Sequence, residues 1–280
     1  MRSKYYYLIA GLPDLTLEDG KLSYTVADFK SELYNQLSTS DKKLIDLFYL
    51  KFDNMNVLNL LKGKEEAFDF RGNFTLELLQ ECIADLKEGK KIDSKVLPIY
   101  LSTFIFDVLS SETVDFVALE NKLMALYYEY AMKSDNKFLT AWFDFNLSIN
   151  NILLALSARK YEWDVASNIV GQTWVCDALR TSHARDFGLS TELEYFEQLN
   201  RMSEITDWVE REKKIDQLRW SWMDEATFFD YFTIERLFIF LLRLEMIERW
   251  IALDKEKGNQ YFRSIIHSLK SEVTIPEEFR

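Results

Sequence analysis

The stretch LFIFLLRLEMIERWIAL, residues Leu237 to Leu253, is the most apolar part of the sequence. A helix that spans a membrane needs about 20 largely apolar residues. Because Arg243, Glu245 and two later charges interrupt this run, we expect a helix that is buried in a soluble protein. Glu245 lies inside the apolar part, where a carboxylate needs a partner. We expect that partner to be Arg243, Arg249 or a polar group on another helix.

Helical periodicity continues on both sides of that stretch, with apolar residues spaced at i, i+3 and i+4. Ser38-Thr39-Ser40-Asp41 is a cluster of helix N-cap residues. A short extended piece at Tyr5–Ile9 stays open. The expected helices are 24–37, 44–61 with a break at Asp53-Asn54, 76–88, one that starts near Pro98, 113–132, 137–159, 161–179 with a break at Gly171, 190–202, 204–220, 224–253 and 259–271.

The composition supports an all-α fold. The chain has 280 residues, of which only 8 are Gly and 3 are Pro. A β-rich protein of this length would need many tight turns, which use these two residues. Hydrophobic residues make up 48% of the chain, enough for a large core. We therefore predict a single all-α protein over residues 1–280.

An internal repeat is suggested by three similar segments. Asn56–Leu61, Asn151–Leu156 and Met246–Ile251 follow one another at intervals of about 95 residues. Each has a β-branched residue at its second position. Three such units, roughly 1–95, 96–190 and 191–280, would nearly fill the chain.

The charge restricts the kinds of partner. The net charge is −12, and no basic stripe suggests binding to nucleic acid. An anionic membrane surface would repel the chain, so a partner with a basic docking surface fits better. Cys82 and Cys176 match no metal-binding spacing and are expected to be buried core residues.

No recognisable set of catalytic, cofactor or metal residues is present in the sequence. There are two histidines, His183 and His267, and neither has a sequence pattern typical of a catalytic triad. The chain lacks both glycine-rich phosphate-binding motifs. We therefore expect a protein that is not an enzyme and has no cofactor. The aromatic runs Tyr5-Tyr6-Tyr7 and Trp220-Ser221-Trp222 are candidate interface anchors, although core packing explains most aromatic residues.

Three stretches resemble the C-type stalk component of the V-type and A-type ATP synthases, whose vacuolar ATPase counterpart is the d-type component. They are the aromatic opening Tyr5–Ala10, the central segment Phe145–Ile152 with its continuation Ser157–Tyr161, and Leu241–Glu248. The chain is most similar to an uncharacterised, divergent branch of that family that is typical of Bacteroidetes. Gly11-Leu12-Pro13 stands where the family has an arginine.

The resemblance implies three similar antiparallel helical modules in one elongated or funnel-like body. It implies a non-catalytic central-stalk subunit that links the membrane proteolipid ring to the rotor shaft. Its partners would be those ATPase subunits, and it would lie in the cytoplasm, peripherally associated with the inner membrane through the complex and without a membrane span. The residues that it marks as interface or structural candidates are Tyr5, Tyr6, Tyr7, Asn151, Arg159, Lys160 and Glu245.

Two other interpretations stay open. The chain is also compatible with a cytoplasmic helical scaffold or adaptor, which would not be found on membranes with ATPase subunits. A small-molecule enzyme or binding protein would need a deep pocket with converging polar groups near Glu245, Arg159 or His183.

Overall fold

The structure is a computed structural model that describes the backbone of residues 5–111, 115–229 and 231–272, with side chains as far as Glu256. Within these residues all regular structure is helical, which confirms the all-α prediction. Short π and 3-10 turns occupy Phe29–Leu33, Tyr34–Gln36 and Glu65–Ala67. The α-helices are α1 (Tyr6–Ala10), α2 (Val26–Asp28), α3 (Thr39–Leu61), α4 (Leu76–Lys87), α5 (Ile99–Leu109), α6 (Phe116–Met132), α7 (Lys137–Lys160), α8 (Val165–Asn168), α9 (Trp174–Thr181), α10 (Phe196–Ser203), α11 (Trp208–Ala226) and α12 (Ile234–Glu272).

Side-chain caps fix the starts of the main helices. The first backbone N–H groups of a helix have no partner within it, and a Ser, Thr, Asn or Asp side chain can accept from one of them. Such caps precede α3, α4, α7, α9 and α11, and they are Ser38, Thr75, Asn136, Thr173 and Asp207. Ser38 opens the predicted N-cap cluster, so this boundary is confirmed.

The predicted break at Asp53-Asn54 is wrong, because α3 continues through both residues. The Asp53 carboxylate accepts hydrogen bonds from the backbone N–H groups of Asn73 (2.9 Å) and Phe74 (3.1 Å). Asn54 accepts the hydroxyl of Tyr100 (2.7 Å). Since both side chains bond outside their own helix, they do not compete with its backbone hydrogen bonds.

The expected helix over 161–179 is mostly loop. Glu162 adopts a left-handed backbone conformation (φ 57°) just after α7. The N–H of Trp163 then bonds to the carbonyl of Ala158 (2.8 Å), and the N–H of Glu162 bonds to that of Arg159 (3.3 Å). This pair of bonds is a Schellman helix end, which usually has glycine where Glu162 stands. A glutamate at this position does not predict such an end.

Four other boundaries differ from the expectation. Tyr5–Ile9 is not extended, because α1 begins at Tyr6. The region 24–37 is a succession of short α, π and 3-10 turns. α10 begins at Phe196, well after the expected start at 190. The two helices expected at 224–253 and 259–271 are replaced by the end of α11 and by a single α12 that runs through Gly258.

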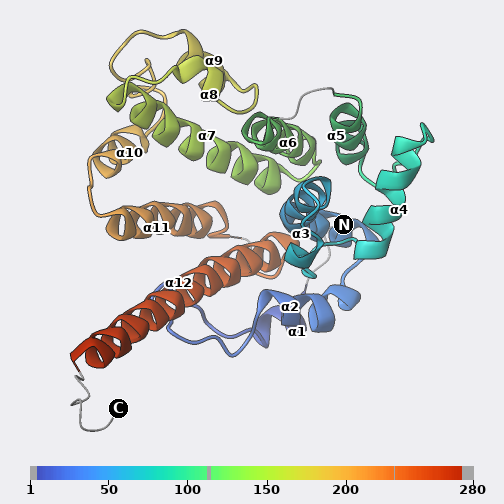
Figure 1. Cartoon of the computed structure of the whole chain (residues 1–280), viewed down its shortest axis with the longest axis horizontal. Coiled ribbons are helices and arrows are strands. Elements are labelled where there is room, and N and C mark those ends of the chain that lie inside the picture. The colour runs from blue at the N-terminus through green and yellow to red at the C-terminus, as the bar shows by residue number, and fades with distance from the viewer. Residues whose placement is uncertain (1–4, 112–114, 230, 273–280) are drawn as a thin grey trace, which may run out of the picture.

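One continuous core joins the helices, and α3 and α12 pack together at its centre. Figure 1 shows α4, α5 and α6 on one side of α3, with α7 lying along α6 and leading to α8, α9 and α10. α11 then returns to pack on α12. Cys82 and Cys176 are both buried, as expected. The C-terminal half of α12 extends away from the rest of the molecule.

The described residues contain no helix that is both long and apolar enough to cross a membrane. α12 is the longest helix, with 39 residues, but Arg243, Glu245 and further charges divide its apolar part.

Candidate functional site

A cleft of about 590 Å³ lies where α3, α6, α7, α11 and α12 meet, beside the loop at 69–71. We call it the central cleft. The exposed methionines Met55 and Met124 lie on its lining. Aromatic side chains form much of its wall, and six of them are Phe48, Phe52, Tyr127, Trp142, Phe143 and Phe238.

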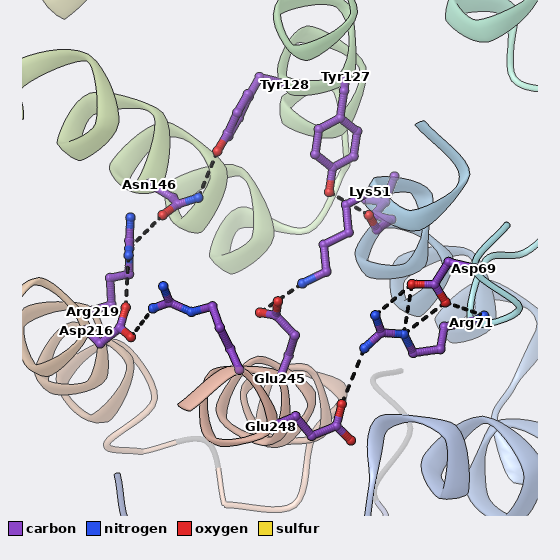
Figure 2. A network of polar contacts seen from close by, with 12 residues as sticks. Lys51, Asp69, Arg71, Tyr127, Tyr128, Asn146, Asp216, Arg219, Glu245 and Glu248 are labelled. Atoms are coloured by element: carbon purple, nitrogen blue, oxygen red, sulfur yellow. Dashed lines mark hydrogen bonds and ion pairs between the residues drawn. The ribbon is translucent and has the colours of Figure 1, made fainter. Parts of the chain in front are cut away.

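Lys51 on α3 and Glu245 on α12 form an ion pair across the central cleft, with Nζ and Oε2 2.9 Å apart. Figure 2 shows the two side chains pointing toward one another. Burial lowers the pKa of Lys51, although the Glu245 carboxylate opposes that effect. Burial alone would raise the pKa of Glu245, but the ammonium of Lys51 and then the guanidinium groups of Arg249 and Arg71 hold it below its ordinary value. The partner expected for Glu245 is therefore on another helix.

A second set of charges centres on Asp216 of α11, whose side chain is almost completely buried. It accepts hydrogen bonds from Arg219 (3.0 Å), from the indole of Trp250 (2.9 Å) and from Arg249. Arg219 also donates to Asn146 on α7 (2.9 Å), as Figure 2 shows. A single buried carboxylate thus connects α7, α11 and α12.

The loop between α3 and α4 closes the site on its third side. Arg71 binds Asp69 of the same loop (2.6 Å) and reaches Glu248 on α12 (3.5 Å). Its guanidinium also lies over the ring of Phe52, 4.3 Å from the ring centre. The other oxygen of Glu248 accepts the backbone N–H of Val26 (2.8 Å). These contacts hold the loop against α3 and α12.

Every cation on the lining of the central cleft has a carboxylate partner. Lys51 pairs with Glu245, Arg71 with Asp69, and Arg219 and Arg249 with Asp216. The cleft therefore presents an apolar concavity whose charges are compensated internally. Such a surface suits contact with an apolar side chain or helix.

Two asparagines, separated by the predicted repeat interval, make the same pair of contacts. Asn56 on α3 donates to the carbonyl of Asp69 (2.8 Å) and accepts its N–H (2.7 Å). Asn151 on α7 does the same with Val170 (2.7 and 3.0 Å). Both side chains are buried. We call each of these a loop clamp, because it pins a long helix to the loop that follows it. Division of the chain into three units stays a prediction.

A glycine lies shortly after each clamped residue. A Cβ at Gly72 would overlap the Asp53 carboxylate. A Cβ at Gly171 would come within 3.0 Å of Leu147, and Gly171 has a φ of +84°, which favours glycine. The two loops therefore share close packing onto the preceding helix as well as the clamp.

The three tyrosines predicted as interface anchors separate by exposure. Tyr5 is buried, and its hydroxyl donates to Asp41 (2.5 Å) and accepts the N–H of Ser38 (3.2 Å). Tyr6 is about half exposed, and Tyr7 is 96% exposed. Only the last two therefore present their rings on the surface.

The other sequence-predicted residues are spread along α7. Arg159 donates to the carbonyls of Ser182 (2.8 Å) and Ala184 (2.6 Å) and lies over the ring of Phe187, so it holds a loop in place. Lys160 is exposed at the end of α7. Neither they nor Asn151 reach Glu245 in the central cleft, and His183 is exposed in the loop after α9.

Sequence reasoning missed Lys51, Arg71 and Asp216. Lys51 carried the same signal as Glu245, namely a charge within an apolar helical run. Asp216 lies in a charged helix, where nothing distinguishes it from exposed neighbours. Within the described residues, no three His, Cys, Asp or Glu side chains are grouped closely enough to hold one metal ion.

Comparison with known proteins gives one match. Residues 2–273 match the family described as "Protein of unknown function (DUF2764)". Neither a curated protein nor a solved structure matches the chain. Because the match covers nearly the whole sequence, the chain belongs to the DUF2764 family.

Proposed function

We propose that this protein is a non-catalytic coupling subunit of a V-type or A-type rotary ATPase, which links the membrane proteolipid ring to the rotor shaft. In that role it lies in the cytoplasm and is held at the membrane through the complex. The observation that carries the proposal is the pair of loop clamps at Asn56 and Asn151. Repeated long-helix units are what the resemblance to the C-type stalk component implies, and the second clamp lies within a segment that carries the resemblance.

The central cleft is the proposed socket for the end of the shaft. It is concave and apolar, and its lining charges are already paired. An apolar helix end can enter without leaving a buried charge unpaired, which would cost several kcal/mol. Met55 and Met124 add flexible apolar side chains, which adapt to a partner's shape.

Dense packing suits a part that transmits torque. Edge-on and stacked ring contacts connect the helices around the cleft, including Phe48 with Phe238 and Phe143 with Phe238. Aromatic pairs of this kind contribute about 0.5–1.5 kcal/mol each beyond their buried area. The buried Asp216 network joins three helices as well. Such an interior resists deformation.

The test is affinity purification of the tagged protein from gently solubilised membranes of its own host. The wild-type chain should recover the proteolipid and the nucleotide-binding subunits together. The double variant Met55→Glu/Met124→Glu, which puts charges on exposed cleft positions, should lose the shaft and nucleotide-binding subunits at least tenfold. Phe106→Glu on α5 is the matched control, because Phe106 is 49% exposed and does not line the cleft. Recovery of no ATPase subunit by the wild-type chain would contradict the proposal.

The central cleft also favours a second candidate function. Its volume lies within the range of about 300–1,000 Å³ that small-molecule sites occupy. In this alternative the cleft binds an apolar small molecule near Glu245. Native mass spectrometry of the protein purified from its host would then show a constant added mass, and Met124→Glu would remove it.

A further inference from the structure

A group of exposed aromatic side chains lies where the N-terminal segment meets the turn between α11 and α12. We call it the aromatic patch. Its two parts are joined by the backbone hydrogen bond from Tyr5 to Phe232 (2.8 Å) and by the rings of Tyr6 and Phe232, whose centres are 4.6 Å apart. Its members and their exposed fractions are Tyr6 (48%), Tyr7 (96%), Phe228 (63%), Phe229 (87%), Tyr231 (59%) and Phe232 (38%).

Buried polar contacts hold the backbone beneath the patch. The Tyr5 hydroxyl is tied to Asp41 and Ser38 at the start of α3. Thr227, which is 2% exposed, donates its hydroxyl hydrogen to the carbonyl of Met223 on α11 (2.8 Å). The patch is thus anchored at both ends to the core, while its own rings face outward. Figure 1 shows the N-terminus near α3 and the start of α12.

The exposed area is that of a protein interface. At about 200 Å² per aromatic side chain, the exposed fractions correspond to roughly 800 Å². The largest apolar patch on a monomer is usually about 300–600 Å², whereas one side of a standard protein interface covers about 800 Å². Aromatic residues are also the ones enriched at interface centres.

Charge indicates which partner covers the patch. Asp224 and Glu225 are exposed on the last turn of α11 beside it, and the whole chain has a net charge of −12. An anionic lipid surface repels such a molecule. Cytoplasmic loops of membrane proteins carry an excess of Lys and Arg, so they complement an acidic border around an apolar centre.

We infer that the aromatic patch docks onto the cytoplasmic loops of a membrane-embedded protein, which in the proposed complex is the proteolipid ring. This inference rests on the proposed function and adds to it a second surface, separate from the central cleft. The rings of the patch cover apolar parts of those loops, and their Lys and Arg side chains meet Asp224 and Glu225. One molecule then holds the ring with its patch and the shaft with its cleft.

The test uses the full-length chain purified from host membranes. The patch variant is Tyr7→Ser/Phe228→Ser/Phe229→Ser, which changes only exposed rings. It should lose at least tenfold of the proteolipid while it keeps the nucleotide-binding subunits. The matched control, Phe70→Ser/Tyr161→Ser/Trp163→Ser, removes three equally exposed rings elsewhere and should recover both. Circular dichroism confirms that each variant is folded.

The outcomes separate the two claims. Equal recovery of proteolipid by the patch variant and the wild-type chain overturns this inference and leaves the proposed function standing. Failure of the wild-type chain to recover any ATPase subunit overturns both.

Two other occupants have their own signatures, and either would overturn the inference. If lipid covers the patch, the purified wild-type chain floats with protein-free phosphatidylcholine vesicles and the patch variant does not. If a second copy covers it, light scattering shows a dimer that the patch variant abolishes. We expect the purified protein to be monomeric and not to float.

Discussion

At the scale of single residues, the site is decided by charges placed within apolar helices. The sequence showed that Glu245 needed a partner but did not identify Lys51 as that partner. Periodicity gives the buried face of each helix, whereas the identity of the helix opposite depends on the packing of the whole chain. Both residues line the central cleft, so their pairing also determines whether the cleft carries an uncompensated charge.

We predict that Lys51 and Glu245 are strongly coupled. Glu245→Leu should destabilise the protein by about 2–4 kcal/mol, because it leaves the ammonium of Lys51 without its carboxylate. Adding Lys51→Met should restore most of that loss. Urea unfolding of the four proteins of this double-mutant cycle measures the coupling. The exposed pair Glu129–Lys133 is the matched control, with an expected coupling below about 0.5 kcal/mol. Single effects that simply add at 51 and 245 would contradict the prediction.

Asp53 should make stability depend on pH. Burial raises its pKa to about 6, although the N–H groups of Asn73 and Phe74 and the ammonium of Lys30 oppose that rise. The folded state therefore holds this proton more tightly than the unfolded chain does. Its contribution to stability is present below about pH 4 and is lost as pH rises through about 6, a loss of the order of 2–3 kcal/mol.

The measurement for Asp53 is a comparison of wild-type and Asp53→Asn proteins by urea unfolding at pH 4, 5, 6 and 7. The variant cannot ionise at this position, so the difference in unfolding free energy between the two proteins should change across that range. Other titrating groups, such as Asp46 and Glu245, are common to both proteins and cancel in the difference. A difference that stays constant from pH 4 to pH 7 would exclude the proposed titration.

At the scale of elements, side-chain caps and loop clamps determine where helices end and how loops pack. Caps such as Ser38 are recognisable in the sequence, because a short polar side chain just before an apolar run has a local function. The Schellman end at Glu162 was not recognisable, because glutamate stands where glycine is usual. The continuity of α3 was missed because the partners of Asp53 and Asn54 lie in later segments.

The loop clamps should behave alike. Asn56→Ala and Asn151→Ala each leave a buried backbone N–H and carbonyl without partners, so each should cost about 2–4 kcal/mol at two groups of roughly 1–2 kcal/mol. Hydrogen exchange should show faster exchange at the Asp69 amide in the first variant and at the Val170 amide in the second. Asn59→Ala is the control, because Asn59 also bonds to a loop carbonyl but is more exposed. Unchanged exchange at both clamped amides would refute this role.

At the scale of the whole molecule, the composition was enough to predict an all-α chain with one large core. It could not predict the central cleft, because a cleft is defined by the way five helices pack rather than by any one of them. The aromatic patch was partly foreseen at Tyr5-Tyr6-Tyr7. Its other half, Phe228 to Phe232, joins it only through tertiary contact.

The central claim is that the cleft receives the rotor shaft of a V-type or A-type ATPase. The most direct measurement is photo-crosslinking in host cells from a benzoylphenylalanine placed at Met124, with Phe106 as the control position. The account predicts an adduct between Met124 and a protein of the central stalk, identified by mass spectrometry, and no such adduct from Phe106. Adducts from Met124 only with proteins outside the ATPase, while the ATPase itself is assembled in the same cells, would contradict it.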